Sequence, residues 1–464
     1  MLFLFHRRIL FTWFWCLAVL LPSASAANDR HVVLITIDGF AAYYLKDPQA
    51  PIPTIRQLAA EGSSAEGMLV STPSVTWPNH TTLVTGVHPE KHSVLFNGAL
   101  IRPGPGQPVK VDSPRDKTDL VQVPTIYDLL HRAGLRTAGI NWPCTRGATS
   151  LDDDFPDVPS QILHTTPRLR DELVQAGILK AATQESFATL SGPAKDQIWT
   201  AAAVHVIQKR RPHFLLVHLL ITDSIQHKYG PQSPAAYTAL ALADAHVRDI
   251  VMALESAGIR ERTTIIITAD HGFESARQVI HPNVVFRKAG LLESSSGPSP
   301  LRARAQIISE GGIAMVYLTD PATFDEDRKK VMELLREHEG IAEILEPDRF
   351  KALGLPDPAR NPQMAHLILV AAKGYAFSNE FRSEVSITEV TLDAGNQGYH
   401  GFLSTHAKMN AAFIATGHQI RRDAKLGLIR NIDVAPTMAR LLGKELPNAD
   451  GRVLTELIEN GASR

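Results

Sequence analysis

Residues 31–39 read HVVLITIDG, an unbroken apolar and β-branched run that ends in Asp38 and Gly39. A run without polar alternation is typical of a strand that is buried on both faces within a parallel sheet. Comparable runs occur at residues 213–221 (HFLLVHLLI), 263–268 (TTIIIT) and 410–415 (NAAFIA), with a weaker one at 136–141. We therefore expect a mainly parallel sheet at the core of the fold.

Helical patterns lie between these strands, at residues 54–61, 125–133, 234–257 and 432–442. Strands that alternate with helices predict an α/β fold in which helices cover both faces of the sheet. Two segments depart from the alternation. Residues 146–195 contain an aspartate run and several prolines and are predicted to be an insertion or cap over the site. Residues 305–375 mix short strands with a helix and are predicted to form a small α+β subdomain.

The composition is that of a globular protein, with 464 residues, 44% hydrophobic residues, 20% charged residues and a net charge of −1. These values argue against disorder, collagen-like repeats and coiled coil. A nearly neutral chain has no long-range field that would collect nucleic acid, so no nucleic-acid-binding surface is expected. The two cysteines, Cys16 and Cys144, cannot form a disulfide framework. A metal site would therefore have to use histidine, aspartate and glutamate.

The N-terminal 26 residues have the form of a secretory signal peptide. A basic patch, His6-Arg7-Arg8, precedes an apolar run at 9–21, and Ala24-Ser25-Ala26 supplies small residues before the cleavage point. The alternative is a membrane anchor, but the run is shorter than the ~20 residues that span a bilayer. We expect residues 27–464 to be exported, either periplasmic or secreted, with no stable membrane anchor. The oligomeric state is not indicated.

Acidic and histidine side chains follow several of the predicted strands. Asp38 ends the first strand and Asp270-His271 follows the strand at 263–268, while Asp223 and His227 lie one helical turn apart after the strand at 213–221. A lone aspartate at a strand end more often caps a turn than binds metal. Three strands that end in such loops predict instead a convergent cluster of carboxylates and imidazoles at one edge of the sheet, and His400 in the segment GYHG (398–401) is a further candidate. Aspartate and neutral histidine without cysteine suit divalent cations, zinc foremost.

A threonine begins the segment TWPNH at residues 76–80. In the structural interpretation Thr76 is a helix N-cap and Pro78 lies in the first helical turn. The same geometry also supports a functional interpretation. A hydroxyl at a helix N-terminus lies in positive potential, and beside a metal ion it could ionise and act as a nucleophile.

Six segments of the chain resemble the nucleotide pyrophosphatase/phosphodiesterase family of the alkaline phosphatase superfamily. In the family's order they are ITIDGF (35–40), TWPNHTTLVTGVHPEKH (76–92), DSIQHKYGP (223–231), TADHGF (268–273), HGFLSTHAKMNAAF (400–413) and RNIDVAPTMARLLG (430–443). Together they span nearly the whole of residues 27–464. The resemblance implies an alkaline phosphatase-like α/β fold.

The resemblance also implies two zinc ions per chain and a role for each ligand. The residues that would hold the first ion are Asp38, Thr76, Asp270 and His271, and those that would hold the second are Asp223, His227 and His400. By the same resemblance Thr76 would be the nucleophile, and Asn97 would contact a non-bridging phosphate oxygen. The Asn97-Gly98 pair is also a common hairpin-turn dipeptide, which is the structural alternative.

Two tryptophans occupy positions where the family lines its substrate pocket. Trp77 could face a nucleobase and Trp142 could line the same pocket, although packing of a buried indole is about equally expected for each. The chain also departs from the family at Gln226, where a glycine is usual, and at Leu403-Ser404, where Asp-Asn is usual. The second departure makes His406 a rival of His400 as metal ligand.

From the activity of the family that it resembles, we expect this chain to be a zinc-dependent phosphodiesterase or nucleotide pyrophosphatase. It would hydrolyse phosphodiester or pyrophosphate bonds of a small-molecule or nucleotide substrate through a covalent phospho-threonine. The alternative is a phosphomonoesterase or phosphonate hydrolase of the same superfamily, although Thr76 together with Asn97 favours diesters. A non-catalytic binding protein on this scaffold would be expected to lack a ligand or the nucleophile, and neither is missing. The preferred nucleobase or head group is not indicated.

Overall fold

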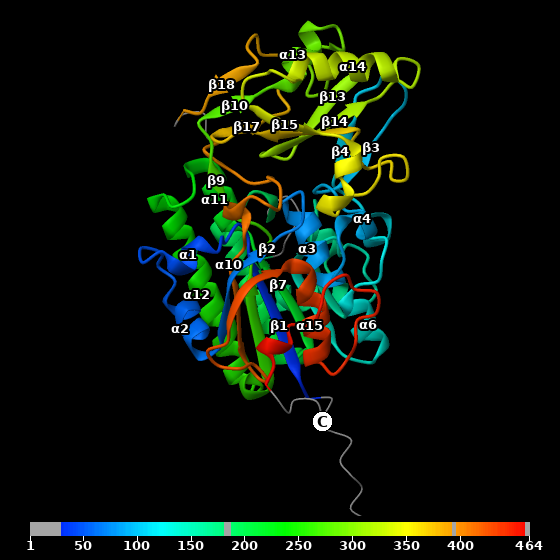
Figure 1. The fold of residues 1–464 in the computed structure, drawn as a ribbon. Coiled ribbons are helices and arrows are strands. Elements are labelled where there is room, and N and C mark those ends of the chain that lie inside the picture. The colour runs from blue at the N-terminus through cyan, green and yellow to red at the C-terminus, as the bar shows by residue number, and fades with distance from the viewer. Residues whose placement is uncertain (1–28, 181–186, 392–395, 460–464) are drawn as a thin grey trace, which may run out of the picture.

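The computed structural model describes residues 29–180, 187–391 and 396–459 (Figure 1). The predicted signal peptide, residues 1–26, therefore lies outside the described residues. Within them, no helix has both the length and the apolar character that a membrane span needs.

Within the described residues, an eight-stranded sheet forms the centre of the molecule. Its strands, in spatial order, are β21 (Lys425–Arg430), β2 (Ser63–Leu69), β20 (Phe413–Gly417), β8 (Thr263–Thr268), β1 (His31–Ile37), β7 (Phe214–Leu219), β5 (Thr137–Pro143) and β6 (Asp153–Asp157). Neighbours pair in parallel except on the two sides of β20, where the pairing is antiparallel. The prediction of a mainly parallel sheet is confirmed.

Helices cover both faces of this sheet, as predicted (Figure 1). One group contains α2 (Pro53–Glu61), α10 (Gly192–Arg210), α11 (Ile221–Tyr229) and α12 (Pro234–Ser256). The other contains α3 (Thr76–Thr85), α6 (Ile126–Arg132) and α15 (Val434–Leu441). Because both faces are covered, every residue of β1, β7 and β8 is buried, which explains their continuous apolar sequences.

Two predicted elements begin later than the sequence suggested. The strand predicted at 410–415 is β20, which starts only at Phe413, because Ala411 pairs instead through isolated bridges with Ala41 and Met68. The helix predicted at 432–442 is α15, which is preceded by a 3-10 turn at Asn431–Asp433.

The segment 146–195 contributes the edge strand β6 and two helices, α7 (Gln161–His164) and α8 (Pro167–Gln175), to the outer end of the sheet. Both helices pack against β6. The sequence does not predict that part of this segment joins the central sheet.

A second, antiparallel sheet lies above the carboxyl edge of the first in Figure 1. Its order is β13 (Ala305–Ser309), β14 (Ile313–Leu318), β16 (Leu367–Ala371) and β15 (Ile341–Leu345). Helices α13 (Pro282–Lys288) and α14 (Phe324–Leu335) pack on it. It occupies most of the segment for which the sequence predicts a small α+β subdomain.

Shorter elements connect the two sheets. The strands β10 (Gln278–Ile280), β17 (Tyr375–Phe377) and β18 (Ile387–Glu389) form a small sheet, β9 (Glu274–Ser275) pairs with β19 (Gly398–Tyr399), β11 (Leu292–Glu293) pairs with β12 (Arg302–Ala303), and β3 (Ala99–Ile101) pairs with β4 (Lys110–Asp112). Single-turn helices are α1 (Tyr43–Lys46), α4 (Pro89–His92) and α5 (Lys117–Leu120).

Candidate active site

The first cluster of candidate metal ligands lies where β1 and β8 end side by side. Asp38 follows β1, and Asp270 and His271 follow β8. The Nε2 atom of His271 is 3.4 Å from Asp38 Oδ1 and 3.3 Å from Asp270 Oδ2. All three side chains are fully buried. The sheet therefore brings together three of the four residues that the sequence assigns to the first metal site.

The atoms that face one another in this cluster make no hydrogen bonds. Asp38 Oδ1, Asp270 Oδ2 and His271 Nε2 are all buried and unpaired. Buried polar groups are normally satisfied, because an unpaired one loses the energy of its contacts with water. The second oxygen of Asp270, in contrast, accepts bonds from the backbone N–H groups of Gly39 (3.2 Å) and His271 (3.1 Å). These three unpaired atoms lie close together and could act as ligands of one cation.

The second cluster is formed by Asp223 and His227 of α11 together with His400, which follows β19. Asp223 Oδ1 lies 3.3 Å from His227 Nε2 and 3.6 Å from His400 Nε2. Each imidazole uses its other nitrogen for a backbone carbonyl: His227 Nδ1 lies 2.9 Å from the oxygen of Gly398, and His400 Nδ1 lies 2.9 Å from that of Ser74. A Nδ1–H donated to a carbonyl leaves the Nε2 lone pair free for a metal.

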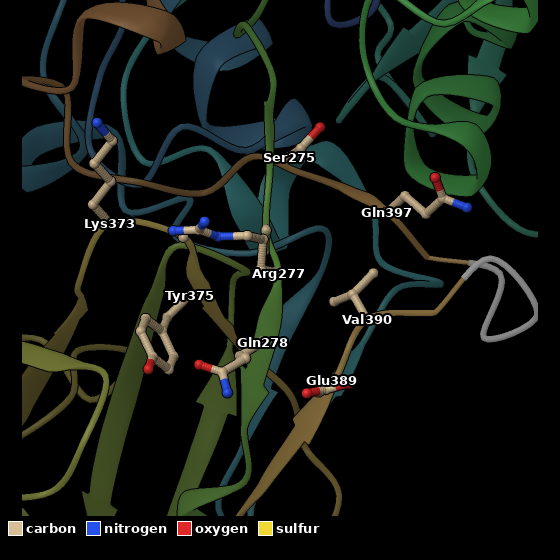
Figure 2. Close-up of a pocket in the computed structure, with 10 residues that line it drawn as sticks. Ser275, Arg277, Gln278, Lys373, Tyr375, Glu389, Val390 and Gln397 are labelled. Carbon is tan, nitrogen blue, oxygen red and sulfur yellow. The ribbon is translucent and has the colours of Figure 1, made fainter.

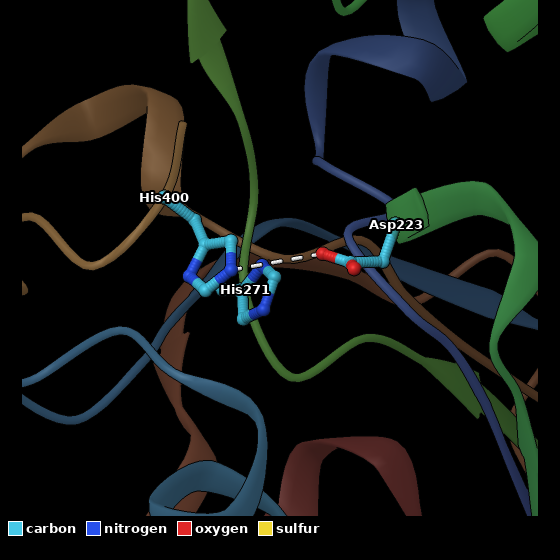
Figure 3. A group of neighbouring side chains, drawn as sticks. All are labelled: Asp223, His271 and His400. Atoms are coloured by element: carbon cyan, nitrogen blue, oxygen red, sulfur yellow. Dashed lines mark ion pairs between the residues drawn. The ribbon is translucent and has the colours of Figure 1, made fainter. Parts of the chain in front are cut away.

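The two clusters adjoin each other through His271. The rings of His271 and His400 stack with centroids 3.8 Å apart. Figure 3 shows Asp223, His271 and His400 converging from three different segments. These three residues, and separately Asp38, Asp270 and His271, each offer ligand atoms within 4.8 Å of one another. Two metal-binding groups that share one imidazole are thus compatible with a closely spaced pair of cations.

Burial and neighbouring charges shift the pKa values of the acids and imidazoles in the two clusters. Burial raises the pKa of Asp38 well above its usual range, and the carboxylates of Asp270 and Asp223 raise it further. Burial acts in the same direction on Asp270, but the neighbouring imidazoles, His271 first, outweigh it and lower the pKa of Asp270. Burial lowers the pKa of His400 well below its usual value. A neutral imidazole beside crowded carboxylates is the donor set that a divalent cation requires.

Thr76 is the first residue of α3, and the N-cap is Val75. The threonine therefore lies one position further into the helix than the predicted N-cap. Its side chain is almost buried, and its hydroxyl makes no hydrogen bond within the described part of the chain. The carbonyl of Ser74, two residues earlier, binds His400, which places the start of α3 beside the second cluster.

Asn97 lies next to the nucleophile candidate. Its Oδ1 accepts a 2.9 Å bond from the backbone N–H of Trp77 at the start of α3. Within the described residues the amide nitrogen of Asn97 has no hydrogen-bond partner. An amide N–H group is thus available beside Thr76.

A family model described as type I phosphodiesterase/nucleotide pyrophosphatase matches residues 32–403, most of the chain and both clusters. The chain belongs to this family. Its central sheet with helices on both faces is therefore the alkaline phosphatase-like fold that the sequence predicted.

Relatives in the family are distant in sequence. The chain is 23% identical over 442 residues to a venom phosphodiesterase of Macrovipera lebetinus, covering 91% of this chain and 44% of that protein. It is 24% identical over 431 residues to ectonucleotide pyrophosphatase/phosphodiesterase family member 3 of Rattus norvegicus, covering 89% of this chain and 42% of that protein. The chain thus spans less than half the length of these curated relatives.

Solved members of the family share the fold. Murine ectonucleotide pyrophosphatase/phosphodiesterase 5 superposes with a TM-score of 0.69 at 17% identity, covering 93% of this chain and 100% of that one. The human counterpart gives a TM-score of 0.70 at 18% identity over the same shares of both chains. The murine protein is also known as an inactive threonine-to-alanine variant in complex with AMP.

The two tryptophans that the family resemblance assigned to the substrate pocket are both buried. Trp142 is 0% exposed and its ring packs edge-on against His80, which is the packing role expected from the sequence as the alternative. Trp77 is 5% exposed and packs in a small apolar cluster with Leu120 and Cys144. Its indole N–H donates to Asp157 at 3.2 Å.

His406, the rival ligand, is engaged elsewhere. Its Nε2 lies 2.8 Å from a carboxylate oxygen of Glu274, which also pairs with Lys408. His400, and not His406, faces Asp223. Of these two candidate ligands, His400 is therefore the one that lies in the second cluster.

Gln226 stands where the family usually has a glycine, and its side chain links two loops of the site. Its amide nitrogen donates to the Gly39 carbonyl at 3.0 Å, and its amide oxygen accepts from the Tyr44 hydroxyl at 2.8 Å. Gly39 follows the candidate ligand Asp38, and Gln226 precedes the candidate ligand His227. The departure therefore adds a buried link between the two loops that carry these candidates.

The sequence does not identify His218 as a residue of the site. It lies in the apolar run 213–221, fully buried, and its Nε2 is 3.1 Å from Asp38 Oδ2. Its position in an apolar run could have suggested a role, because a histidine inside a strand buried on both faces needs a polar partner.

A pocket of about 540 Å³ is lined by Gln397, Arg277 and Lys373 among others (Figure 2). One wall is tied to the site, because the backbone N–H of Gln397 donates to the His227 carbonyl at 2.7 Å. Arg277 and Lys373 extend on the same side of the pocket in Figure 2. Within the described residues neither makes an ion pair, although Glu389 also lines the pocket. The positively charged side chains of Arg277 and Lys373 are therefore available to a negatively charged ligand in this pocket.

Proposed function

We propose that the protein is a zinc-dependent phosphodiesterase or nucleotide pyrophosphatase that acts through a covalent phospho-threonine at Thr76. The observation that carries this proposal is the pair of Asp/His clusters that share His271 at the start of the helix bearing Thr76. Family membership supports the same reaction class. The name of the murine relative, an inactive threonine-to-alanine variant with AMP, supports both a catalytic threonine and a nucleotide ligand.

The residues proposed for the first zinc ion are Asp38, Thr76, Asp270 and His271, and those for the second are Asp223, His227 and His400. Hard carboxylates and neutral imidazoles without cysteine favour zinc among common cations. When bound, such a pair would act as a Lewis acid toward the attacking and leaving oxygens of an in-line displacement.

Thr76 and Asn97 have separate roles in the proposed reaction. The Thr76 hydroxyl, at the positive end of α3, gives its proton to solvent and attacks phosphorus, so that an Oγ1–P bond forms while the bond to the leaving oxygen breaks and the leaving group departs as an anion or takes a proton from solvent. The amide of Asn97 donates to a non-bridging phosphate oxygen, whose charge grows in the transition state. In the second displacement a water oxygen attacks phosphorus and Thr76 is released.

The pocket lined by Gln397, Arg277 and Lys373 would suit a substrate whose leaving group carries additional negative charge. Arg277 and Lys373 would attract a distal phosphate of a pyrophosphate-linked nucleotide more than an uncharged aryl group. We therefore include pyrophosphate bonds among the proposed targets.

We also propose that the protein is exported, to the periplasm or beyond the cell. The form of residues 1–26 supports export, as does the occurrence of venom phosphodiesterases among the relatives.

Substrate preference tests the proposed function. The purified full chain with zinc restored is assayed on bis-p-nitrophenyl phosphate, p-nitrophenyl phosphate and ATP. We expect kcat/KM for the diester to exceed that for the monoester by about tenfold or more, equivalent to ~1.4 kcal/mol of transition-state binding. ATP is expected to yield AMP and pyrophosphate. A monoester preference would move the chain to the phosphomonoesterase alternative, and zinc-independent or absent turnover would contradict the enzyme proposal.

A further inference from the structure

His218 is the fifth of the six residues of β7, and each of its ring nitrogens lies within hydrogen-bond distance of an oxygen atom. Its Nε2 lies 3.1 Å from Asp38 Oδ2, and its Nδ1 lies 3.1 Å from the backbone oxygen of Asn141. The side chain is 0% exposed. A ring held at both ends inside the core has no freedom to turn away from Asp38.

The anchor on the far side of the ring is a local distortion of β5. The register of β5 against β6 shifts between Ile140 and Trp142, and Asn141 has a φ of 55° in the left-handed region. Bulges of this kind re-aim a backbone group, and a non-glycine residue at positive φ persists only where its surroundings hold it there. Asn141 is held on both sides, because its amide donates to the His218 carbonyl at 3.2 Å and its oxygen accepts from Gln161 at 3.3 Å.

The two oxygens of Asp38 have different surroundings. Oδ2 is the partner of His218, whereas Oδ1 has no hydrogen bond and lies 3.4 Å from His271 Nε2. Rotation of the carboxylate would exchange the two oxygens. The contact with His218 therefore selects Oδ1 as the atom presented to the first metal position.

The other buried histidine near this cluster lacks such a contact. His80 Nδ1 is bonded to the Thr76 carbonyl at 2.8 Å and its Nε2 to the Thr36 hydroxyl at 2.8 Å, and it approaches Asp270 only to 3.8 Å. His80 thus fixes the helix start, and His218 alone among the described histidines bonds to the oxygen of Asp38 that does not face His271.

We propose that His218, anchored on the strained Asn141 carbonyl, is a positioning residue that orients Asp38 for the first metal ion. This inference rests on the metal-binding part of the proposed function. Outer partners that orient metal ligands raise metal affinity about 10- to 100-fold in other proteins. The effect should fall on the first site, because the second-site ligands Asp223, His227 and His400 make no contact with His218.

Zinc affinity of two variants of the full chain tests this proposal. In His218→Leu, chelator competition is expected to show one of the two zinc ions bound about 10- to 100-fold more weakly, with the other unchanged. His218→Gln should restore most of that affinity, since its amide nitrogen can reach Asp38 Oδ2. The d–d spectrum of the cobalt-substituted protein should change for one site in His218→Leu. Diester turnover should show a lower kcat with little change in KM.

The matched control is His281→Leu. His281 is also a buried histidine, but its ring nitrogens bond to the hydroxyls of Ser378 (2.7 Å) and Thr388 (3.0 Å) and to no proposed ligand. If His218→Leu does not fold, His218→Asn, whose shorter amide cannot reach Asp38, is compared with His218→Gln. Equal zinc affinity in His218→Leu or His218→Asn and the wild type, or an equal loss in His281→Leu, would overturn the proposal. Failure of the wild type to bind two zinc ions would instead contradict the proposed function itself.

Discussion

Replacing Thr76 with alanine is expected to lower kcat for diester hydrolysis by about 10³-fold or more, because removal of a covalent nucleophile leaves only binding and electrostatic assistance. Zinc binding should largely persist, since Asp38, Asp270 and His271 remain around the first position. The measurement is steady-state turnover of bis-p-nitrophenyl phosphate together with metal content. Loss of turnover with retained metal separates a chemical role of Thr76 from a structural one.

Two further threonine variants make this test specific. Thr76→Ser keeps a hydroxyl at the same position and should retain measurable turnover. Thr85→Ala lies at the other end of α3, where the hydroxyl donates only to the Thr81 carbonyl, and should stay within a few-fold of wild type. Turnover by Thr76→Ala above about a tenth of the wild-type rate would rule out a covalent threonine mechanism.

His271→Ala is expected to abolish turnover and to remove zinc as well. The imidazole Nε2 faces both carboxylates of the first cluster, and the ring stacks on His400 of the second. Its loss leaves Asp38 and Asp270 as two buried, crowded acids with no imidazole ligand between them. We expect at least one zinc ion to be lost on dialysis and kcat to fall about 10³-fold or more.

His406→Ala is the control for that variant. His406 is a nearby histidine, but it pairs with Glu274 and contacts no member of either cluster. Metal content and turnover should match those of the wild type. If His406→Ala lost as much zinc as His271→Ala, His406 and not His400 would be the second-site ligand.

Much of the fold is predictable because the central strands are buried on both faces. β1 and β8 coincide with the apolar runs 31–37 and 263–268, since no polar position interrupts them. The helices between them follow from the same alternation. Their polar and apolar positions repeat with the helical period.

The outer strands of the sheet carry no such signal. β2 has the sequence SSAEGML and β6 has the sequence DDFPD, and each lies at or near an edge of the sheet. Small, acidic and proline residues are poor strand formers, so long-range pairing, and not local propensity, places them. The same holds for β20, whose antiparallel insertion between β2 and β8 is a matter of tertiary contacts.

The metal-ligand candidates could be predicted from sequence because they follow strands that end at one edge, and because their motifs resemble a known family. His218 and Asn141 could not, because their roles depend on a contact between β7 and β5 and on a left-handed backbone angle. The burial of Trp142 likewise depends on its packing against His80, which no spacing in the sequence reveals.

The two-metal mechanism at Thr76 is best tested by a crystal structure of Thr76→Ala with zinc and AMP. We expect two zinc peaks in anomalous difference density about 4 Å apart. One should be bound by Asp38, Asp270 and His271, and the other by Asp223, His227 and His400. The phosphate should bridge both ions, with the Asn97 amide on one of its oxygens. A single metal peak, or AMP bound away from residue 76, would contradict the account.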